Sequence, residues 1–423
     1  MKISAKLLCT TLALFPVASA VQAASPRDVI DGYADLALAK YADSLTAAQS
    51  LQTAVRVFID APSAETHAAA KDAWLAARVP YQQTEAYRFG NAVVDAWEGK
   101  VNAWPLDEGL IDYVDTVHYG EENEENDFFR ANIVANPILQ VGGQTVDAGE
   151  ITPALLGQLH EIDGVEANVA TGYHAIEFLL WGQDINGTNA GAGARSHTDF
   201  LIDGCTNGNC DRRADYLNAA TDLLIADLEE IVAAWGADGA ARADLAAQSD
   251  AQGLSSILTG LGSLSYGELA GERMQLGLIL HDPEEEHDCF ADNTHNSHFY
   301  DALGIQNVYL GRYTRLDGTE IEVPALADLT AAVNADLDVE MSAKLDATMA
   351  AMQVMKDRAD SGIEAYDQMI GFGNTEGNAV VQSAIDALVS QTRTIEALVA
   401  ALDIAEITVE GSDSLDRPSA VFQ

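Results

Sequence analysis

Alanine and leucine recur at intervals of three and four residues along most of this 423-residue chain. Side chains at such intervals share one face of an α-helix, so each segment carries an apolar stripe that must pack against a neighbour. The pattern is longest over residues 33–51, 63–77, 216–235, 326–359 and 378–402. We therefore expect an all-α protein.

Alternation of apolar and polar residues, the pattern of a strand, is scarce. It occurs over residues 139–141, before Gly142 and Gly143, and over residues 320–323, before Pro324. Each segment is short and stands beside turn-forming residues, so we expect each to be one arm of a small hairpin.

The first 23 residues have the features of a cleavable signal peptide. Lys2 and Lys6 precede an apolar run at 7–17, and small residues around Ala23 suit cleavage there. The run is too short to cross a bilayer, and no later segment offers about 20 apolar residues, so no transmembrane segment is expected. We predict export to the periplasm.

Acidic residues outnumber basic ones three to one. The chain has 66 Asp and Glu against 22 Lys and Arg, and loss of Lys2 and Lys6 with the signal leaves a net charge of −46. Such a surface repels nucleic acid and anionic lipid, so neither is an expected partner. Solubility in a salty medium and attraction of cations both remain open as explanations of this charge.

Cys205 and Cys210 enclose a turn-forming sequence and are a candidate disulfide in an oxidising compartment. Cys289 is left over. A zinc site at this pair is not indicated, because no second pair and no suitably spaced histidine accompany it.

A glycine-rich stretch near 182–210 lacks any apolar period and is the expected junction between two bundles of about four helices each. Tyr81 precedes Arg88, and Tyr266 precedes Arg273, by seven residues, which suggests related halves. The predicted division is a signal peptide at 1–23, a bundle at 24–190, a linker at 191–210, a bundle at 211–410 and a polar tail at 411–423.

His174 and Glu177 lie three residues apart within a strongly apolar segment. Helical spacing places both side chains on one face, where they can bind one ion together. Imidazole with carboxylate suits iron, zinc or copper better than calcium. A structural hydrogen-bonded pair remains the alternative.

Two further segments carry polar residues where helices usually pack. Tyr81, Glu85 and Arg88 have the spacing of one helical stripe, and residues 265–273 combine acids and an arginine with glycines that permit close approach of another backbone. A third segment, from His281 through Cys289 to His298, is interpreted as a solvated acidic loop rather than a separate metal site.

The sequence Gly172-x-His174-x-x-Glu177 resembles the Gly-x-His-x-x-Glu motif of the imelysin family, named after an insulin-cleaving membrane protease. Four other segments, spread over most of the chain, resemble its iron-regulated protein A branch: 78–90, 104–108, 267–273 and 286–295. That branch often has serine where this chain has Ala291.

The resemblance implies two related helical bundles with a site between them, in the periplasm or peripherally associated with the outer membrane, and a link to iron supply. It implies metal ligation by His174 and Glu177. The positions expected to add donors or support are Glu85 and Glu268, with Tyr81, Arg88, Asp107, Tyr266, Glu272 and Arg273 around them.

Three functions follow as alternatives. The first is a non-catalytic metal-binding protein, most simply for iron with zinc or copper as other candidates, that takes a metal or ferric chelate and works with iron-uptake components of the envelope. The second is an imelysin-type metallopeptidase, although the chain has no His-Glu-x-x-His and Phe178 follows Glu177. The third is a scaffold with no metal. Covalent c-type haem is excluded because no Cys-x-x-Cys-His occurs, whereas haem held without a covalent bond by His174 remains open.

Overall fold

The computed structural model describes residues 24–123, 126–141, 143–405 and 407–422. The predicted signal peptide lies outside the described residues. Within the described part of the chain, no helix has the length and apolar character needed to cross a membrane.

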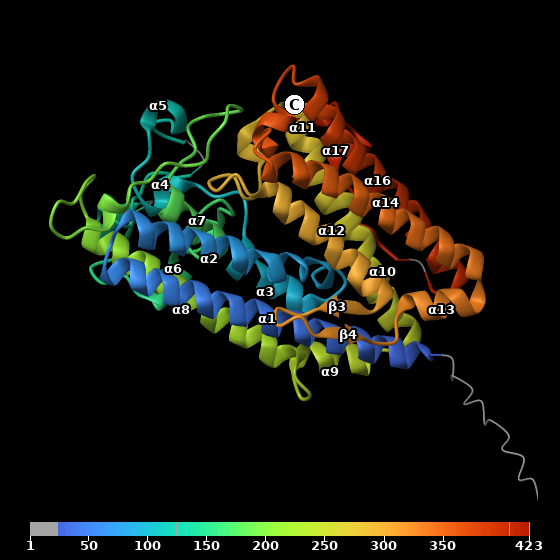
Figure 1. The fold of residues 1–423 in the computed structure, drawn as a ribbon. Helices are drawn as coiled ribbons and strands as arrows, with labels where there is room; N and C mark the ends of the chain where they lie inside the picture. Colours follow the sequence, from blue (N-terminus) through green and yellow to red (C-terminus); the bar gives the residue numbers. More distant parts are fainter. Residues whose placement is uncertain (1–23, 124–125, 142, 406, 423) are drawn as a thin grey trace, which may run out of the picture.

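The first group of helices is built on the long helix α1 (Pro26–Asp60), which packs along α2 (Ala64–Gln82) and α8 (Cys210–Trp235). The shorter helices α3 (Ala92–Asn102) and α7 (Gly172–Trp181) lie against α8 and against each other. Figure 1 shows these blue and green helices together on one side of the molecule.

The second group consists of α10 (Asp250–Ser263), the π-helical segment η4 (Leu264–Gln275), α12 (Thr294–Leu310), α14 (Ala335–Asp360) and α16 (Thr375–Ala401). α14 pairs with α16, and α12 contacts both α14 and α2, so α12 joins the two groups (Figure 1).

Short elements connect these helices. They are η1 (Glu85–Tyr87), α4 (Glu108–Ile111), α5 (Thr116–Tyr119), α6 (Pro153–Leu159), η2 (Ile162–Gly164), η3 (His197–Phe200), α9 (Ala240–Ala247), α11 (Leu276–Leu280), η5 (Pro283–Glu285), α13 (Leu326–Val333), α15 (Tyr366–Ile370), α17 (Asp413–Asp416) and η6 (Ala420–Phe422).

All five predicted helical segments are helical, with one interruption. The predicted helix at 326–359 is divided into α13 and α14 by Asn334, whose backbone is extended at φ −157° and whose side chain accepts a hydrogen bond from the Leu337 N–H. Asparagine satisfies the free N–H groups at a helix start, so it begins a new helix here. Serine does the same at Ser25 and Ser63, and each serine N–H in turn donates to the side chain of the third helical residue, Asp28 or Thr66.

Both predicted hairpin arms are strands. β1 (Ile138–Val141) pairs antiparallel with β2 (Gln144–Asp147), and β3 (Arg312–Thr314) pairs antiparallel with β4 (Glu320–Glu322). The described residues contain these two small sheets and no other. The predicted all-α class with minor hairpins is therefore confirmed.

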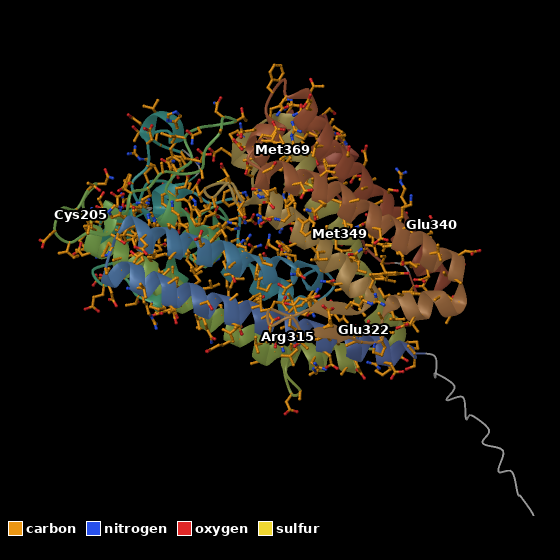
Figure 2. All side chains as sticks on the ribbon, in the orientation of Figure 1. Cys205, Arg315, Glu322, Glu340, Met349 and Met369 are labelled. Atoms are coloured by element: carbon orange, nitrogen blue, oxygen red, sulfur yellow. A yellow bond between two sulfur atoms is a disulfide. The ribbon has the colours of Figure 1, made fainter. Side chains whose placement is uncertain are left out.

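The helix that follows the predicted linker, α8, packs against the first group of helices. α8 begins at Cys210, which is bonded to Cys205 in a disulfide, and then runs back along α1. Cys205 lies at the left end of the molecule in Figure 2. The predicted domain limits remain a prediction, and the packing of α8 favours a division after this helix.

Candidate metal centre

Helix α7 carries the Gly-x-His-x-x-Glu sequence and is buried along its whole length. Gly172, its first residue, has φ +80°, and a Cβ there would lie 2.4 Å from the Val101 carbonyl oxygen. Only glycine fits this combination of left-handed backbone and close approach. The motif glycine therefore lets α7 begin directly against the end of α3.

His174 and Glu177 project from α7 into the interior and contact each other. His174 Nδ1 lies 3.0 Å from Glu177 Oε2, and the Ala291 N–H donates to Glu177 Oε1 at 2.9 Å. Both side chains are fully buried. Glu177 thus orients the imidazole, and its other oxygen ties α7 to the segment that contains Ala291.

Residues 286–293 belong to the stretch from His281 to His298 that the sequence predicts to be a solvated acidic loop, and for these residues the prediction is wrong. Glu286, His287 and Asp288 are 1%, 3% and 0% exposed. The segment folds inward because Asp288 forms a buried ion pair with Arg78 of α2, Nη2 to Oδ1 at 2.6 Å. A buried partner offsets the desolvation of a carboxylate that would otherwise keep the loop in water.

His174, His287 and Asp288 meet at one point. One nitrogen or oxygen atom from each lies within 4.8 Å of the other two. His174 Nε2 and His287 Nδ1 are buried and have no hydrogen-bond partner among the described residues. Two histidines that each keep an unsatisfied ring nitrogen, grouped with a carboxylate, fit a metal ion with nitrogen and oxygen ligands.

The protonation states favour ligation. Burial lowers the pKa of His174 to about 3 and holds the pKa of His287 well below its usual value, so both rings are neutral at pH 7. Burial would raise the pKa of Asp288, but Arg78 and the surrounding donors hold it below the ordinary value. Neutral imidazoles and an ionised carboxylate are the forms that bind metals.

Asp288 is fixed by donors from several elements. Asn293 Nδ2 and Ser297 Oγ donate to its Oδ2 at 2.7 and 2.8 Å, in addition to Arg78. Arg78 is held in turn by Asn102 of α3, Nη1 to Oδ1 at 2.7 Å. Such supporting bonds orient a ligand and maintain its position when no ion is bound.

A cleft of about 760 Å³ leads to the centre. His287 and Trp104 line its inner wall, and the Trp104 ring lies 5.1 Å from the His174 ring, centroid to centroid. Its other walls carry acids from four parts of the chain together with Arg88 and Arg273. The cleft therefore connects solvent to one of the candidate ligands.

Glu85 and Glu268, expected as metal donors, surround Arg273 instead of His174. Arg273 donates to Glu268, Glu85 and Asp301 at 2.8, 2.8 and 3.0 Å. Arg88 lies 3.7 Å from the same Glu268. These residues form an ion-pair cluster beside the cleft, in which the acids outnumber the arginines.

The prediction that Tyr81, Glu85 and Arg88 form one stripe on a single helix is wrong. α2 ends at Gln82, and Glu85 belongs to the separate segment η1. Thr84 Oγ1 donates to the Tyr81 carbonyl at 2.6 Å and replaces the helical bond there.

The remaining residues predicted to support the metal site do not all lie around it. Tyr81 packs on Tyr173, ring centroids 4.9 Å apart, and both rings contact the Arg78 guanidinium. Glu272 lines the cleft, whereas Tyr266 donates to Asp416 at 2.7 Å, outside it. Asp107 accepts a hydrogen bond from Asn126.

His287 and Asp288 are not among the residues that the sequence predicts at this centre. Acidic neighbours on either side make this segment look solvated, and nothing local signals its burial. Its resemblance to the family through residues 286–295 was the one available signal.

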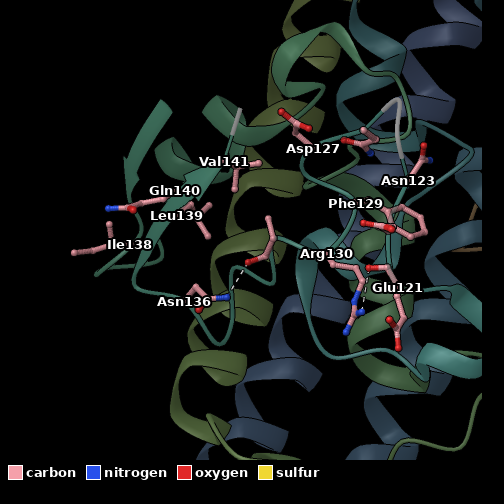
Figure 3. A pocket seen from close by; sticks show the side chains of 13 residues that line it. Glu121, Asn123, Asp127, Phe129, Arg130, Asn136, Ile138, Leu139, Gln140 and Val141 are labelled. Atoms are coloured by element: carbon pink, nitrogen blue, oxygen red, sulfur yellow. Dashed lines mark hydrogen bonds between the residues drawn. The ribbon is translucent and has the colours of Figure 1, made fainter. Parts of the chain in front are cut away.

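Figure 3 shows a second hollow beside β1, between Asp127, Arg130 and Gln140. Its lining residues within the described part of the chain include neither histidine nor cysteine. It therefore offers oxygen donors only and does not compete with the His174 centre as a site for iron, zinc or copper.

The chain is similar in sequence to one protein family and to one curated protein. A family model described as imelysin matches residues 37–395. The curated protein iron-regulated protein A of Synechococcus elongatus is 32% identical over 95 residues, and the match spans 22% of this chain and 27% of that protein. The resemblance predicted from the motifs is confirmed.

A solved structure from Parabacteroides distasonis ATCC 8503, named as a candidate iron-regulated protein A precursor, has a similar fold. The TM-score is 0.62 at 18% identity, with 90% of this chain and 97% of that chain covered. At this identity the likeness shows the fold alone.

Proposed function

The chain belongs to the imelysin family, and from this premise we propose that it is an exported envelope protein that binds iron at His174, His287 and Asp288. Glu177 would hold the imidazole of His174 in place. The observation that carries the proposal is the pair of buried imidazole nitrogens that have no partner among the described residues. A buried polar atom without a partner costs free energy, which coordination would recover.

The ligand types support a transition metal. Two imidazoles and one carboxylate suit iron, zinc and copper, whereas calcium and magnesium prefer oxygen alone. Iron is favoured because the partial relative from Synechococcus elongatus is named an iron-regulated protein. Three protein ligands leave coordination positions open, and the cleft at His287 would admit the metal or a small chelate.

The arginines of the cleft are already paired with acids, so the expected ligand is the metal ion itself or a small chelate of low charge. All the nitrogens of Arg273 already donate to acids. Arg88 also lies beside acids, but its side chain is 27% exposed, so it is the better candidate to contact a carboxylate of a chelate. Export, and cooperation with iron-uptake components of the envelope, are parts of the same proposal.

A metallopeptidase is the second candidate, because three ligands beside an open cleft are also the arrangement of hydrolytic zinc centres. Such an enzyme needs a carboxylate base facing the metal-bound water. Glu177 has one oxygen on His174 and the other on the Ala291 N–H, so it is not free for that task. Chelator-sensitive cleavage of insulin B chain by the parent, lost in His287→Ala, would establish the enzyme.

The test of iron binding is elemental analysis of full-length protein purified from a bacterial periplasm without chelator. We expect about one equivalent of iron in the parent and little in His174→Ala or His287→Ala, because each loses a ligand. His118→Ala is the matched control, since the His118 side chain is exposed and its Nδ1 lies 3.1 Å from Asp115, away from the three candidate ligands. Equal iron in the parent and His287→Ala would refute the proposal.

A further inference from the structure

The cleft that leads to His287 is lined by many more acids than bases. Seven carboxylates border it against two guanidinium groups, which gives the lining a net charge of −5 with histidine neutral. Burial raises the pKa of Glu98, one of the seven, to about 7, and a proton on Glu98 leaves a charge of −4. The route from solvent to the candidate ligands is therefore strongly negative.

Both arginines of the lining are surrounded by acids. Arg273 donates to three carboxylates at 2.8 to 3.0 Å. Arg88 has three carboxylates within 3.7 Å of its guanidinium nitrogens. The positive charge of each guanidinium is thus compensated before a ligand arrives, so an anionic ligand gains little from either.

Four acids of the lining have no such compensation. Glu161, Glu166, Glu272 and Glu285 form no ion pair with lysine or arginine within the described ranges. The first three are exposed, whereas His287 is 3% exposed, and its Nδ1 has no hydrogen-bond partner in the part of the chain that the structure describes. Uncompensated carboxylates therefore lie toward solvent, and a buried nitrogen ligand lies at the inner wall.

The cleft selects by charge rather than by size. Its volume of about 760 Å³ exceeds the space of a metal ion with six waters, about 180 Å³ at about 30 Å³ for each water. A cleft lined by one sign of charge focuses the electric field and changes association rates by about 10- to 1000-fold, upward for a cation and downward for an anion.

On the basis of the proposed iron site, we propose that the metal reaches the centre through this cleft as a hydrated cation, and that the cleft repels negatively charged chelates. The carboxylates of the rim act as steering groups and do not bind the metal at its final position. The substrate is accordingly an aqua ion such as Fe²⁺ rather than the ferric complex of a polycarboxylate.

The experiment is anaerobic stopped-flow mixing of metal-free, full-length protein with Fe²⁺. Tryptophan fluorescence reports binding, since the Trp104 ring lies 5.1 Å from that of His174. A triple variant that combines Glu161→Gln, Glu166→Gln and Glu272→Gln should slow association at least about fivefold and leave dissociation nearly unchanged, because rim charges act on encounter. Its association rate should also depend less on salt between about 20 and about 300 mM NaCl.

Ferric dicitrate, a chelate with net negative charge, should respond in the opposite sense. We expect it to associate with the parent at least about tenfold more slowly than Fe²⁺, and to associate faster with the triple variant than with the parent. A change of fold in the variant would slow both ligands, so opposite responses identify charge as the cause.

The matched control changes net charge by the same amount outside the cleft. It combines Asp72→Asn, Asp203→Asn and Asp238→Asn, three exposed positions that do not line the cleft, and should bind Fe²⁺ at close to the parent rate. Equal Fe²⁺ association rates in the two triple variants, or ferric dicitrate that associates with the parent as fast as Fe²⁺, would overturn steering by the cleft and leave the iron site standing. A parent that binds no iron would overturn both.

Discussion

At the scale of single residues, Glu177 determines which ring nitrogen of His174 is left without a partner. The carboxylate holds Nδ1 at 3.0 Å, which leaves Nε2 as the nitrogen without a partner. Glu177 is itself held by the Ala291 N–H. The arrangement makes Glu177 a positioning residue for the imidazole, a role that carboxylates commonly have beside metal-bound histidines.

We predict that Glu177→Gln keeps the fold and weakens metal affinity by about 10- to 100-fold, because an amide oxygen is a weaker acceptor for the ring N–H than a carboxylate and makes the other ring nitrogen a poorer ligand. Competition with a chromophoric chelator measures this change. Glu150→Gln, at an exposed position, is the control with expected parent affinity. Unchanged affinity in Glu177→Gln would show that the carboxylate has no part in binding.

At the scale of elements, the start of α7 sets the position of the centre. Gly172 lies against Val101, so α7 and α3 approach at backbone distance. Trp74 of α2 donates to the Tyr173 carbonyl at 2.9 Å and fixes the same turn from the other side. The His174 side chain is therefore placed by contacts with two neighbouring helices.

Gly172→Ala should lower the free energy of unfolding by at least about 2 kcal/mol, since the new Cβ needs both a left-handed backbone and space that Val101 occupies. Urea unfolding followed by circular dichroism measures it. Gly157→Ala in α6 is the matched control, because nothing lies within 4 Å of its added Cβ. We expect no loss of unfolding free energy in this variant. A parent-like midpoint for Gly172→Ala would contradict the packing argument.

At the scale of the whole molecule, the described part of an acidic chain buries a lysine between its two groups of helices. Lys40 of α1 is 0% exposed and donates to the carbonyls of Gln83 and Gly304 at 3.1 and 3.5 Å. Burial lowers the pKa of Lys40 to about 7 from 10.5. Between these values the unfolded chain binds a proton that the folded chain does not.

Stability should therefore rise with pH from about 7 to 10 through Lys40, by up to about 1.4 kcal/mol per pH unit. In Lys40→Met this contribution is lost, so its unfolding free energy should depend less on pH over that range. Unfolding titrations of both proteins at several pH values compare the slopes. Identical slopes would show that Lys40 stays charged in the folded protein.

Local patterns in the sequence were enough to predict the helices and to pair His174 with Glu177. Ala and Leu periodicity predicted segments such as 216–235 because it records burial within one helix. His174 and Glu177 were paired by spacing for the same local reason. Asn334 divides a predicted helix, and α2 ends before Glu85, because capping bonds compete with periodicity at those points.

The distant residues that lie beside His174 could not be predicted from local patterns, because packing between remote helices places them there. Asp288 is buried because Arg78, 210 positions away, comes within 2.6 Å of it, and the pair then brings His287 to His174. Composition makes residues 284–288 look like a solvated loop, since charge favours water unless a partner is present. That partner is supplied by packing between remote helices, which no local pattern encodes.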